Sequence, residues 1–213
     1  MSLNIKTCSC IRVGKRFNVL HKELSIDGNC IKWSNEVKYI GIVIVAASVV
    51  RINFHDIKMK LFQSLKGVLG KLGSAPQVNL TLSLVSSFCN PILLYVIEAL
   101  HLKKADIVSL TFSYNSVFTK LFSTFDKSVI TLCQFYTYQL PLSYIIDART
   151  LNFYSDLCNG TCYTSNCLFK WFGEAERKTI EERYNILPSD SAYVSSMKIK
   201  KTFEHIAEGI NMI

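Results

Sequence analysis

The stretch Trp33-Ser-Asn-Glu-Val-Lys-Tyr39-Ile-Gly41-Ile-Val-Ile44 carries the strongest fold signal in this sequence. Its β-branched residues predict a strand over Val37–Val45, and Ser34-Asn35 just before it is typical of a turn. Gly41 interrupts the strand at a point where another backbone or a ligand has room to approach closely. The stretch therefore predicts β structure in the first part of the chain.

The residues that precede this stretch also have the pattern of strands. Asp27-Gly28 is a strong hairpin-turn signal between Glu23–Ile26 and Cys30–Trp33. The segment Thr7–Val13 predicts one more short strand. We therefore expect residues 1–50 to form a small antiparallel β unit.

Beyond Arg51 the hydrophobic period changes from that of a strand to that of a helix. Apolar residues recur at helical spacing from Ile57 to Leu72, and Gly73 follows at a place where helix ends favour glycine. Pro91 is expected to kink or divide the next helix. The chain is therefore expected to be α+β, with a short antiparallel β unit followed by a helical bundle. The later helices are expected over Val78–Leu100, Ala105–Phe122, Val129–Tyr136, Ser143–Leu157 and Glu174–Asn185, with a weakly held helix from Lys198 onward.

Helical spacing and composition also indicate which side chains form the core. In the expected helix Val78–Leu100, the spacing turns the following residues inward: Leu80, Leu84, Phe88, Ile92 and Tyr95. Aromatic side chains within the later helices are expected to be buried as well. These are Phe112, Tyr114, Phe118, Phe122, Phe135, Tyr136 and Tyr138.

Charge is distributed unevenly along the chain. The formal net charge is +8, of which residues 1–150 carry +9 and residues 151–213 carry −1. A basic body suits a polyanionic partner, because each neutralised phosphate releases counterions. A solvated basic face is the alternative explanation, and charge alone does not separate the two.

The eight cysteines are scattered, and the opening Met1–Lys6 is too polar for a secretory signal. We therefore expect reduced thiols and an intracellular location, cytoplasmic or nuclear. The cluster Cys158, Cys162 and Cys167 lacks a fourth Cys or nearby His, so a zinc site there would need a ligand from elsewhere in the chain. No metal is the expectation, with zinc left as the alternative. The longest apolar run, Ile40–Val50, is about half of the roughly 20 residues that span a membrane, so we expect no membrane partner.

Several segments occur in the order found in reverse transcriptases of non-LTR (LINE-like) retrotransposons. Leu3–Lys6 and Ile11–Phe17 match that family's lead into a Tyr-Leu-Gly hairpin, to which Tyr39-Ile-Gly41 is similar. Pro91-Ile-Leu-Leu-Tyr95-Val-Ile-Glu98 resembles the Pro-x-Leu-Leu-Tyr-Gly-x-Glu segment of the family's thumb. Phe118-Thr-Lys120-Leu-Phe122 resembles the Phe-x-Lys-Leu-Phe that follows it.

The resemblance spans residues 1–155 and divides the chain into three parts. It implies that residues 1–50 are the end of a reverse transcriptase palm and residues 51–157 its helical thumb, with residues 158–213 a tail of uncertain role. Two departures stand out. Ile40 replaces the usual Leu of the hairpin, and Val96 stands where the family commonly has Gly.

The resemblance also assigns roles to single residues. Lys6 matches a lysine near the incoming nucleotide, where it neutralises the triphosphate or protonates the leaving pyrophosphate as a general acid. Tyr39 and Gly41 match the hairpin that holds the primer: Gly41 lets the backbone approach the primer, and Tyr39 packs or hydrogen-bonds beneath the turn. The alternatives are a solvated lysine at a strand end and an ordinary β-hairpin.

Six lysines are candidates for contacts along an RNA–DNA hybrid. Such contacts position a duplex without reading its sequence, and a hybrid is sensed by its shape. Each lysine taken alone is also explained as a solvated surface charge. The six are Lys58, Lys60, Lys66, Lys71, Lys103 and Lys104.

The parent reaction that the resemblance implies is RNA-directed DNA synthesis from deoxynucleoside triphosphates with Mg²⁺. In that family the palm's paired metal-binding aspartates precede the region matched here, and Asp106, Asp126, Asp147 and Asp156 form no such pair. We therefore expect the chain to bind RNA template and DNA primer, with no cofactor of its own. Polymerisation is expected to need the palm and fingers of the parent polymerase. The alternatives are a non-catalytic nucleic-acid-binding module and a helical interaction protein derived from such an element.

Overall fold

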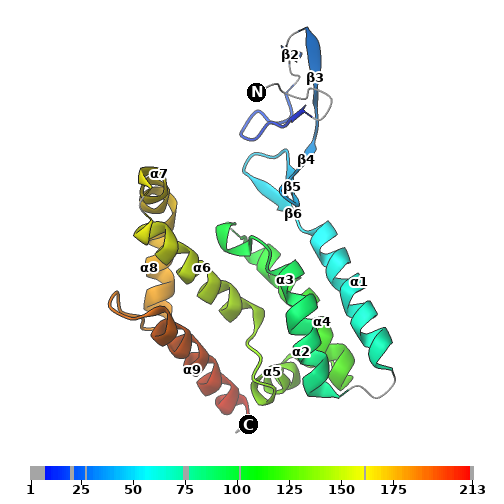
Figure 1. The fold of residues 1–213 in the computed structure, drawn as a ribbon, viewed down its shortest axis with the longest axis vertical. Helices are drawn as coiled ribbons and strands as arrows, with labels where there is room; N and C mark the ends of the chain where they lie inside the picture. The colour runs from blue at the N-terminus through cyan, green and yellow to red at the C-terminus, as the bar shows by residue number, and fades with distance from the viewer. Residues whose placement is uncertain are drawn as a thin grey trace. The chain divides into compact units, whose positions relative to one another are not determined.

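The computed structural model describes residues 8–19, 22–26, 28–73, 77–100, 102–160 and 162–211. The chain forms two compact units, Met1–Ile57 and Lys58–Ile213. The first holds two small three-stranded sheets and the second is mostly helical, so the expected mixed α+β class is confirmed (Figure 1). The boundary falls after Ile57 rather than after residue 50, and residues 158–213 belong to the helical unit.

The first sheet has the strand order β1-β3-β2, with β1 at Ser9–Cys10, β2 at Leu24–Ile26 and β3 at Asn29–Trp33. β2 and β3 are antiparallel, as expected from the hairpin signal, and Gly28 has φ 77° in their connection. β1 is parallel to β3. The unit is therefore not purely antiparallel, and β1 is shorter than the strand expected over Thr7–Val13.

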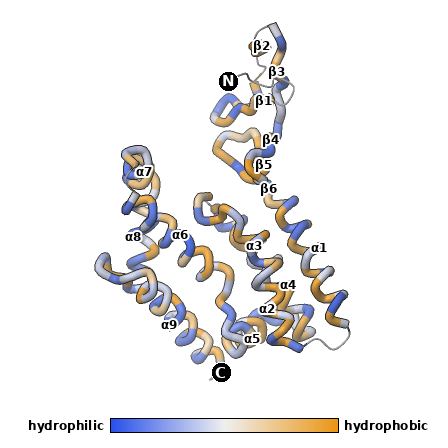
Figure 2. Tube along the Cα trace, viewed as in Figure 1, coloured by the Kyte–Doolittle hydropathy of each residue, from blue (hydrophilic) through white to orange (hydrophobic). Residues whose placement is uncertain are grey.

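The second sheet has the order β4-β5-β6 and is antiparallel throughout. Its strands are β4 (Glu36–Tyr39), β5 (Ile42–Val45) and β6 (Arg51–Asn53). The expectation of one strand over residues 37–45 is wrong, because the chain reverses direction between Tyr39 and Ile42. β5 is the continuous orange stretch Ile-Val-Ile-Val in Figure 2. β6 was not expected, because its three residues are too few to show a period.

The helical unit follows the expected order with some differences in the bounds. The helix α1 (His55–Leu72) crosses the boundary between the units, and Gly73 has φ 75° directly after it, as its position predicted. The α-helices that follow are α2 (Val78–Phe88), α3 (Asn90–Leu93), α4 (Lys104–Phe122), α5 (Lys127–Tyr136), α6 (Leu142–Asn159), α7 (Tyr163–Leu168), α8 (Glu174–Arg183) and α9 (Ala192–Asn211). The 3₁₀-helix η2 (Ile97–Ala99) follows α3, and the π-helix η3 (Phe169–Gly173) joins α7 to α8.

The helix α6 is the centre of this unit. It packs against η2 and α4 on one side and against α7, α8 and α9 on the other (Figure 1). Fully buried leucines lie on two of the elements in the first contact region, Leu110 on α4 and Leu142 on α6. In the second, Tyr184 lies in a core cluster with Leu151, Ile180, Ile186 and Ile199.

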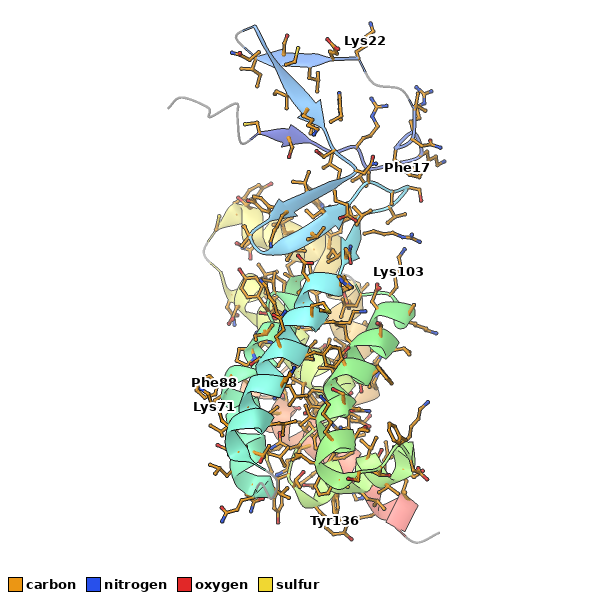
Figure 3. The ribbon with its side chains drawn as sticks, turned by 90° about the vertical axis from the view of Figure 1, so that its right-hand side faces the viewer. Phe17, Lys22, Lys71, Phe88, Lys103 and Tyr136 are labelled. Atoms are coloured by element: carbon orange, nitrogen blue, oxygen red, sulfur yellow. The ribbon has the colours of Figure 1, made fainter. Side chains whose placement is uncertain are left out.

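The expected core face of Val78–Leu100 is wrong. Leu80 is 48% exposed and Phe88 61% exposed, and Figure 3 shows Phe88 projecting from the unit. Apolar residues occupy more than one face of this segment, so helical spacing alone did not identify the buried face. The buried residues are Thr81, Leu82, Val85, Cys89, Leu93, Leu94 and Ile97.

Several aromatic residues expected in the core lie on the surface. Phe112 is 75% exposed, Tyr136 62% and Tyr138 83%, whereas Tyr114 and Phe118 are buried as expected. The surface of a folded protein is largely apolar, so an aromatic residue in a helix is not evidence of burial.

The last helix is longer and better packed than the weakly held helix expected from Lys198 onward. α9 begins at Ala192 rather than near Lys198, and its Ile199, Phe203 and Ala207 are buried. Tyr184, which belongs to the same core cluster as Ile199, is also held by Asp147 on α6. The Asp147 carboxylate accepts hydrogen bonds from Arg183 at 2.6 Å and from the Tyr184 hydroxyl at 2.7 Å.

Candidate nucleic-acid interface

The tip of the β4–β5 hairpin is a two-residue turn made by Ile40 and Gly41. Tyr39 pairs with Ile42, which leaves these two residues to reverse the chain. Both have left-handed backbone, with φ 46° at Ile40 and φ 80° at Gly41, as is typical of a type I′ turn. Glycine adopts this conformation freely, whereas a β-branched isoleucine is strained in it. The turn therefore holds Ile40 at the tip at an energetic cost.

The tip presents apolar side chains to solvent. Tyr39 is 63% exposed and Ile40 is 62% exposed. The hairpin is supported, since Ile42 beside the turn is buried and the Asn53 side chain on β6 donates a hydrogen bond to Glu36 on β4 at 3.4 Å. The arrangement thus offers an aromatic ring and a closely turned backbone on a supported strand pair.

The lysines of α1 surround the helix and do not form one stripe. Lys60 and Lys71 lie within about 20° of each other around the helix axis, while Lys58 and Lys66 lie about 120–160° away from them. Lys60, Lys66 and Lys71 are exposed. Lys58 is partly buried, and its amine donates a hydrogen bond to the Ser109 hydroxyl on α4 at 2.9 Å.

Two further lysines flank the start of α4. Lys103 and Lys104 are exposed, and the Lys103 backbone N–H donates to the Asp106 carboxylate at 3.2 Å. Cations are disfavoured at a helix N-terminus by the helix dipole, and Asp106 offsets part of this. Lys103 and Lys71 lie well apart on opposite sides of the unit (Figure 3). The six candidate lysines are therefore spread over the unit and do not form a single cluster.

Charge pairing divides the helical unit into two halves. The N-terminal half (58–136) has eight Lys/Arg and three Asp/Glu. The C-terminal half (142–211) has eight Lys/Arg and nine Asp/Glu. Among the residues that the structure describes, none of the eight N-terminal lysines forms an ion pair, whereas five of the eight C-terminal cations do. The paired cations are Arg149, Arg177, Arg183, Lys198 and Lys200. The unpaired lysines of the N-terminal half are Lys58, Lys60, Lys66, Lys71, Lys103, Lys104, Lys120 and Lys127.

Most of the candidate metal-binding aspartates are used in other ways. Asp106 lies at the start of α4, Asp126 caps α5 through the Ser128 backbone N–H at 2.7 Å, and Asp147 binds Arg183 and Tyr184. Within the described ranges, no three His, Cys, Asp or Glu side chains come together as metal ligands, the Cys158–Cys162–Cys167 cluster included. Lys6 lies outside the residues that the structure describes.

Sequence reasoning singled out Glu98 in the thumb-like segment but missed its partner. Arg149 on α6 donates two hydrogen bonds to the Glu98 carboxylate, at 3.1 and 3.0 Å. Burial raises the pKa of Glu98, but the hydrogen bonds and charge of Arg149 outweigh it and hold the pKa below its ordinary value of 4.5. Two residues before Glu98, Val96 has left-handed backbone with φ 59°. In the reverse transcriptases that this segment resembles, glycine is common at this position, and that was the available signal that the backbone turns left-handed here.

One segment of the described chain, Val78–Ala99, is long and apolar enough to cross a membrane. This holds by length and composition only, and core helices of soluble proteins pass the same test. The segment is divided in this fold, because α2 ends at Phe88 and Val96 separates α3 from η2.

No protein-family model, curated protein or solved structure matches this chain.

Proposed function

We propose that this chain is the C-terminal part of a non-LTR retrotransposon reverse transcriptase. In this proposal, residues 1–50 include the end of the palm and the primer-holding hairpin, and the helical unit holds the RNA–DNA hybrid as a thumb. The chain contributes binding and positioning to RNA-directed DNA synthesis, while the paired aspartates that hold Mg²⁺ come from the rest of the parent enzyme.

The hairpin tip is the observation that carries the proposal. A primer terminus needs a rigid turn whose backbone comes close to the sugar–phosphate, with few side chains in the way. The Ile40-Gly41 turn offers such a backbone, and Tyr39 beside it offers an exposed ring that can pack against a sugar or base. The strain at Ile40 agrees with a functional role, because backbone outliers cluster at ligand-binding sites.

The unpaired lysines give independent support. A lysine that has no carboxylate partner is available to neutralise a phosphate. The N-terminal half of the helical unit concentrates such lysines, which suits a surface that follows a duplex over some length. The spread of the lysines around α1 favours contacts with more than one stretch of the nucleic-acid sugar–phosphate backbone.

The test of binding is the affinity of the purified chain for a labelled RNA–DNA hybrid across a salt series, compared with single strands. The proposal expects preference for the hybrid and an affinity that falls steeply with salt. Tyr39→Ala is expected to weaken binding to a hybrid with a recessed primer end, whereas Val49→Ala, an equally exposed apolar change in the same unit, is the control. Equal affinity of the two variants would refute the role of the hairpin.

The test of catalysis is primer extension on a primed RNA template. We expect no extension by this chain alone with Mg²⁺ and deoxynucleoside triphosphates, since Asp106, Asp126 and Asp147 are engaged in caps and ion pairs. Extension above background would overturn this part of the proposal.

The alternative is a non-catalytic nucleic-acid-binding or helical interaction protein derived from such an element. The exposed aromatic residues of the C-terminal half, among them Tyr163, Trp171 and Phe172, favour an interaction surface there. A binding module predicts salt-sensitive affinity for any duplex, without dependence on a primer end. An interaction protein predicts no duplex binding even at low salt.

A further inference from the structure

A cavity of about 650 Å³ lies between the α3–η2 segment, the α5–α6 loop and α6. Its lining includes Asn90, Tyr95, Val96, Tyr138 and Arg149. The volume falls in the range of pockets that hold small ligands. The three segments are separated in sequence by up to 59 positions, from Asn90 to Arg149, so the cavity exists only in the folded unit.

Backbone strain is found on two separate walls of this cavity. Val96 has φ 59° and Tyr138 has φ 56°, both left-handed. Neither residue is glycine, and Val96 is β-branched, so each conformation costs free energy that the rest of the fold supplies. Such residues cluster at binding sites and also end helices, as Tyr138 does directly after α5. Tyr138 also lines a neighbouring hollow, so the strain at Val96 is the more specific mark of this cavity.

The polar groups of the cavity are incompletely used. The Asn90 Oδ1 atom is shielded from solvent and accepts no hydrogen bond from any described group. A buried acceptor without a donor is rare in folded proteins and is relieved when a ligand supplies one. Because Oδ1 is shielded, contact with a ligand requires rotation of the Asn90 amide about χ2, a torsion with broad energy wells.

The cavity also contains a cation that retains free donors. Arg149 uses its Nε and one Nη2 hydrogen on Glu98, and a guanidinium has five N–H donors. The remaining donors are geometrically suited to a phosphate or carboxylate. The Glu98 carboxylate holds the guanidinium in place, so binding an anion costs little additional ordering.

Two exposed tyrosines complete the site. Tyr95 is 46% exposed and Tyr138 is 83% exposed, and aromatic rings of this kind stack on planar heterocycles. We propose that the cavity binds a planar heteroaromatic ring that carries a phosphate, with the chemistry of a nucleoside monophosphate. The ring packs against Tyr138 and Tyr95, an N–H group of the ring satisfies Asn90, and the phosphate meets Arg149. This site goes beyond the proposed function, because it requires neither a hybrid nor a primer end.

The experiment is calorimetric titration of the full chain with AMP, GMP, CMP and UMP, with adenosine and inorganic phosphate as partial ligands. For ligands of this size we expect a Kd between about 10 μM and 1 mM for at least one nucleotide. Adenosine and phosphate alone are expected to bind at least about tenfold more weakly.

Three variants locate the site. Tyr138→Ala is expected to weaken nucleotide binding at least tenfold, and Arg149→Gln is expected to abolish the preference for AMP over adenosine. Tyr136→Ala is the matched control: Tyr136 is 62% exposed and lines a neighbouring hollow but not this cavity. We expect its Kd to stay within twofold of the wild type.

The proposal is overturned if no nucleotide gives a saturable signal up to about 5 mM, or if Tyr136→Ala weakens binding as much as Tyr138→Ala. Adenosine binding as tightly as AMP would overturn the role of Arg149. These outcomes are separable from those for the hybrid. A chain that fails to bind a hybrid still binds AMP if this proposal holds, and the reverse is equally measurable.

Discussion

The two halves of the helical unit carry the same number of cations but use them differently. The eight lysines of the N-terminal half have no ion-pair partner among the described residues, and the five paired cations of the C-terminal half each meet a carboxylate within 4 Å. Paired charges contribute to the fold and are largely neutralised, although Arg149 keeps N–H donors that Glu98 does not use. Unpaired charges remain available to an external anion. The number of cations alone would have assigned both halves to the same partner, whereas the net charge, +5 against −1, and the pairing distinguish them.

The largest expected effect comes from neutralising exposed lysines of the N-terminal half. The triple variant Lys60→Gln, Lys66→Gln and Lys71→Gln should lower affinity for an RNA–DNA hybrid roughly 10- to 500-fold near 0.1 M salt. The slope of log affinity against log salt should flatten by up to about 2.7, because each lost phosphate contact removes about 0.9.

The matched control removes three cations from the C-terminal half. Lys170, Lys178 and Lys201 are exposed, and they form no ion pair within the described chain. Replacing all three by Gln changes net charge by the same amount. Binding should fall less than threefold, and equal losses in the two triple variants would show that only the total charge matters.

The bounds of several helices show where prediction from the sequence succeeded. The helices α4, α5 and α6 were expected within two residues of their observed bounds, because each has one apolar face and a clear start or stop signal. The β class of residues 1–50 followed from β-branched residues and turn pairs. The candidate lysines were chosen from the resemblance to a polymerase thumb and from the basic charge of the segment, but their lack of ion-pair partners could be seen only in the fold.

Other features could not be read from the sequence for identifiable reasons. Leu80 and Leu82 are equally apolar, and only packing decided that Leu82 is buried. The Ile40 turn places a β-branched residue where Asn or Gly is usual, so turn propensity gave no signal for a reversal there, and only the resemblance to a Tyr-Leu-Gly hairpin indicated it. The cavity around Tyr138 joins three separate segments, and no local pattern indicates that they meet.

The next effect tests how tightly the C-terminal half is packed. A Cβ atom at Gly173 would lie 2.8 Å from the Tyr154 ring and 2.9 Å from that of Phe169. Gly173→Ala should therefore lower the free energy of unfolding by about 1–3 kcal/mol, measured by urea denaturation. Gly209→Ala on α9 meets open space and is the control, with unchanged or slightly raised stability. If both variants behaved alike, close packing at Gly173 would be excluded.

A smaller effect is expected at a strained position of the N-terminal half. Val96→Gly relieves about 1–2 kcal/mol of left-handed strain and costs about 0.5–1 kcal/mol in added freedom of the unfolded chain. The net result is a gain near 1 kcal/mol, or a Tm higher by about 2–4 °C. A lower Tm in thermal unfolding would show that the Val96 side chain contributes more than its backbone costs.

The smallest effect concerns the ion pair that joins the halves. Arg149 holds the pKa of Glu98 below 4.5 in the folded chain. The ion pair therefore stabilises the fold fully above about pH 4.5, and this stabilisation is lost as the pH falls through the lower pKa that Glu98 has in the folded chain. Glu98→Gln should therefore flatten the fall in stability below about pH 4.5. Urea denaturation at a series of pH values measures this, and an unchanged profile would exclude the pair as its source.

The chain has two tryptophans, and the boundary between the compact units separates them. Trp33 lies on β3, with its indole N–H donating to the Lys22 carbonyl at 3.1 Å, while Trp171 is 74% exposed on the π-helix. Each unit therefore carries its own fluorophore, one partly covered and one in water. Replacing either tryptophan by phenylalanine leaves a probe of a single unit. Coincident emission changes on heating would identify one cooperative protein, and separate transitions would identify two domains that unfold on their own.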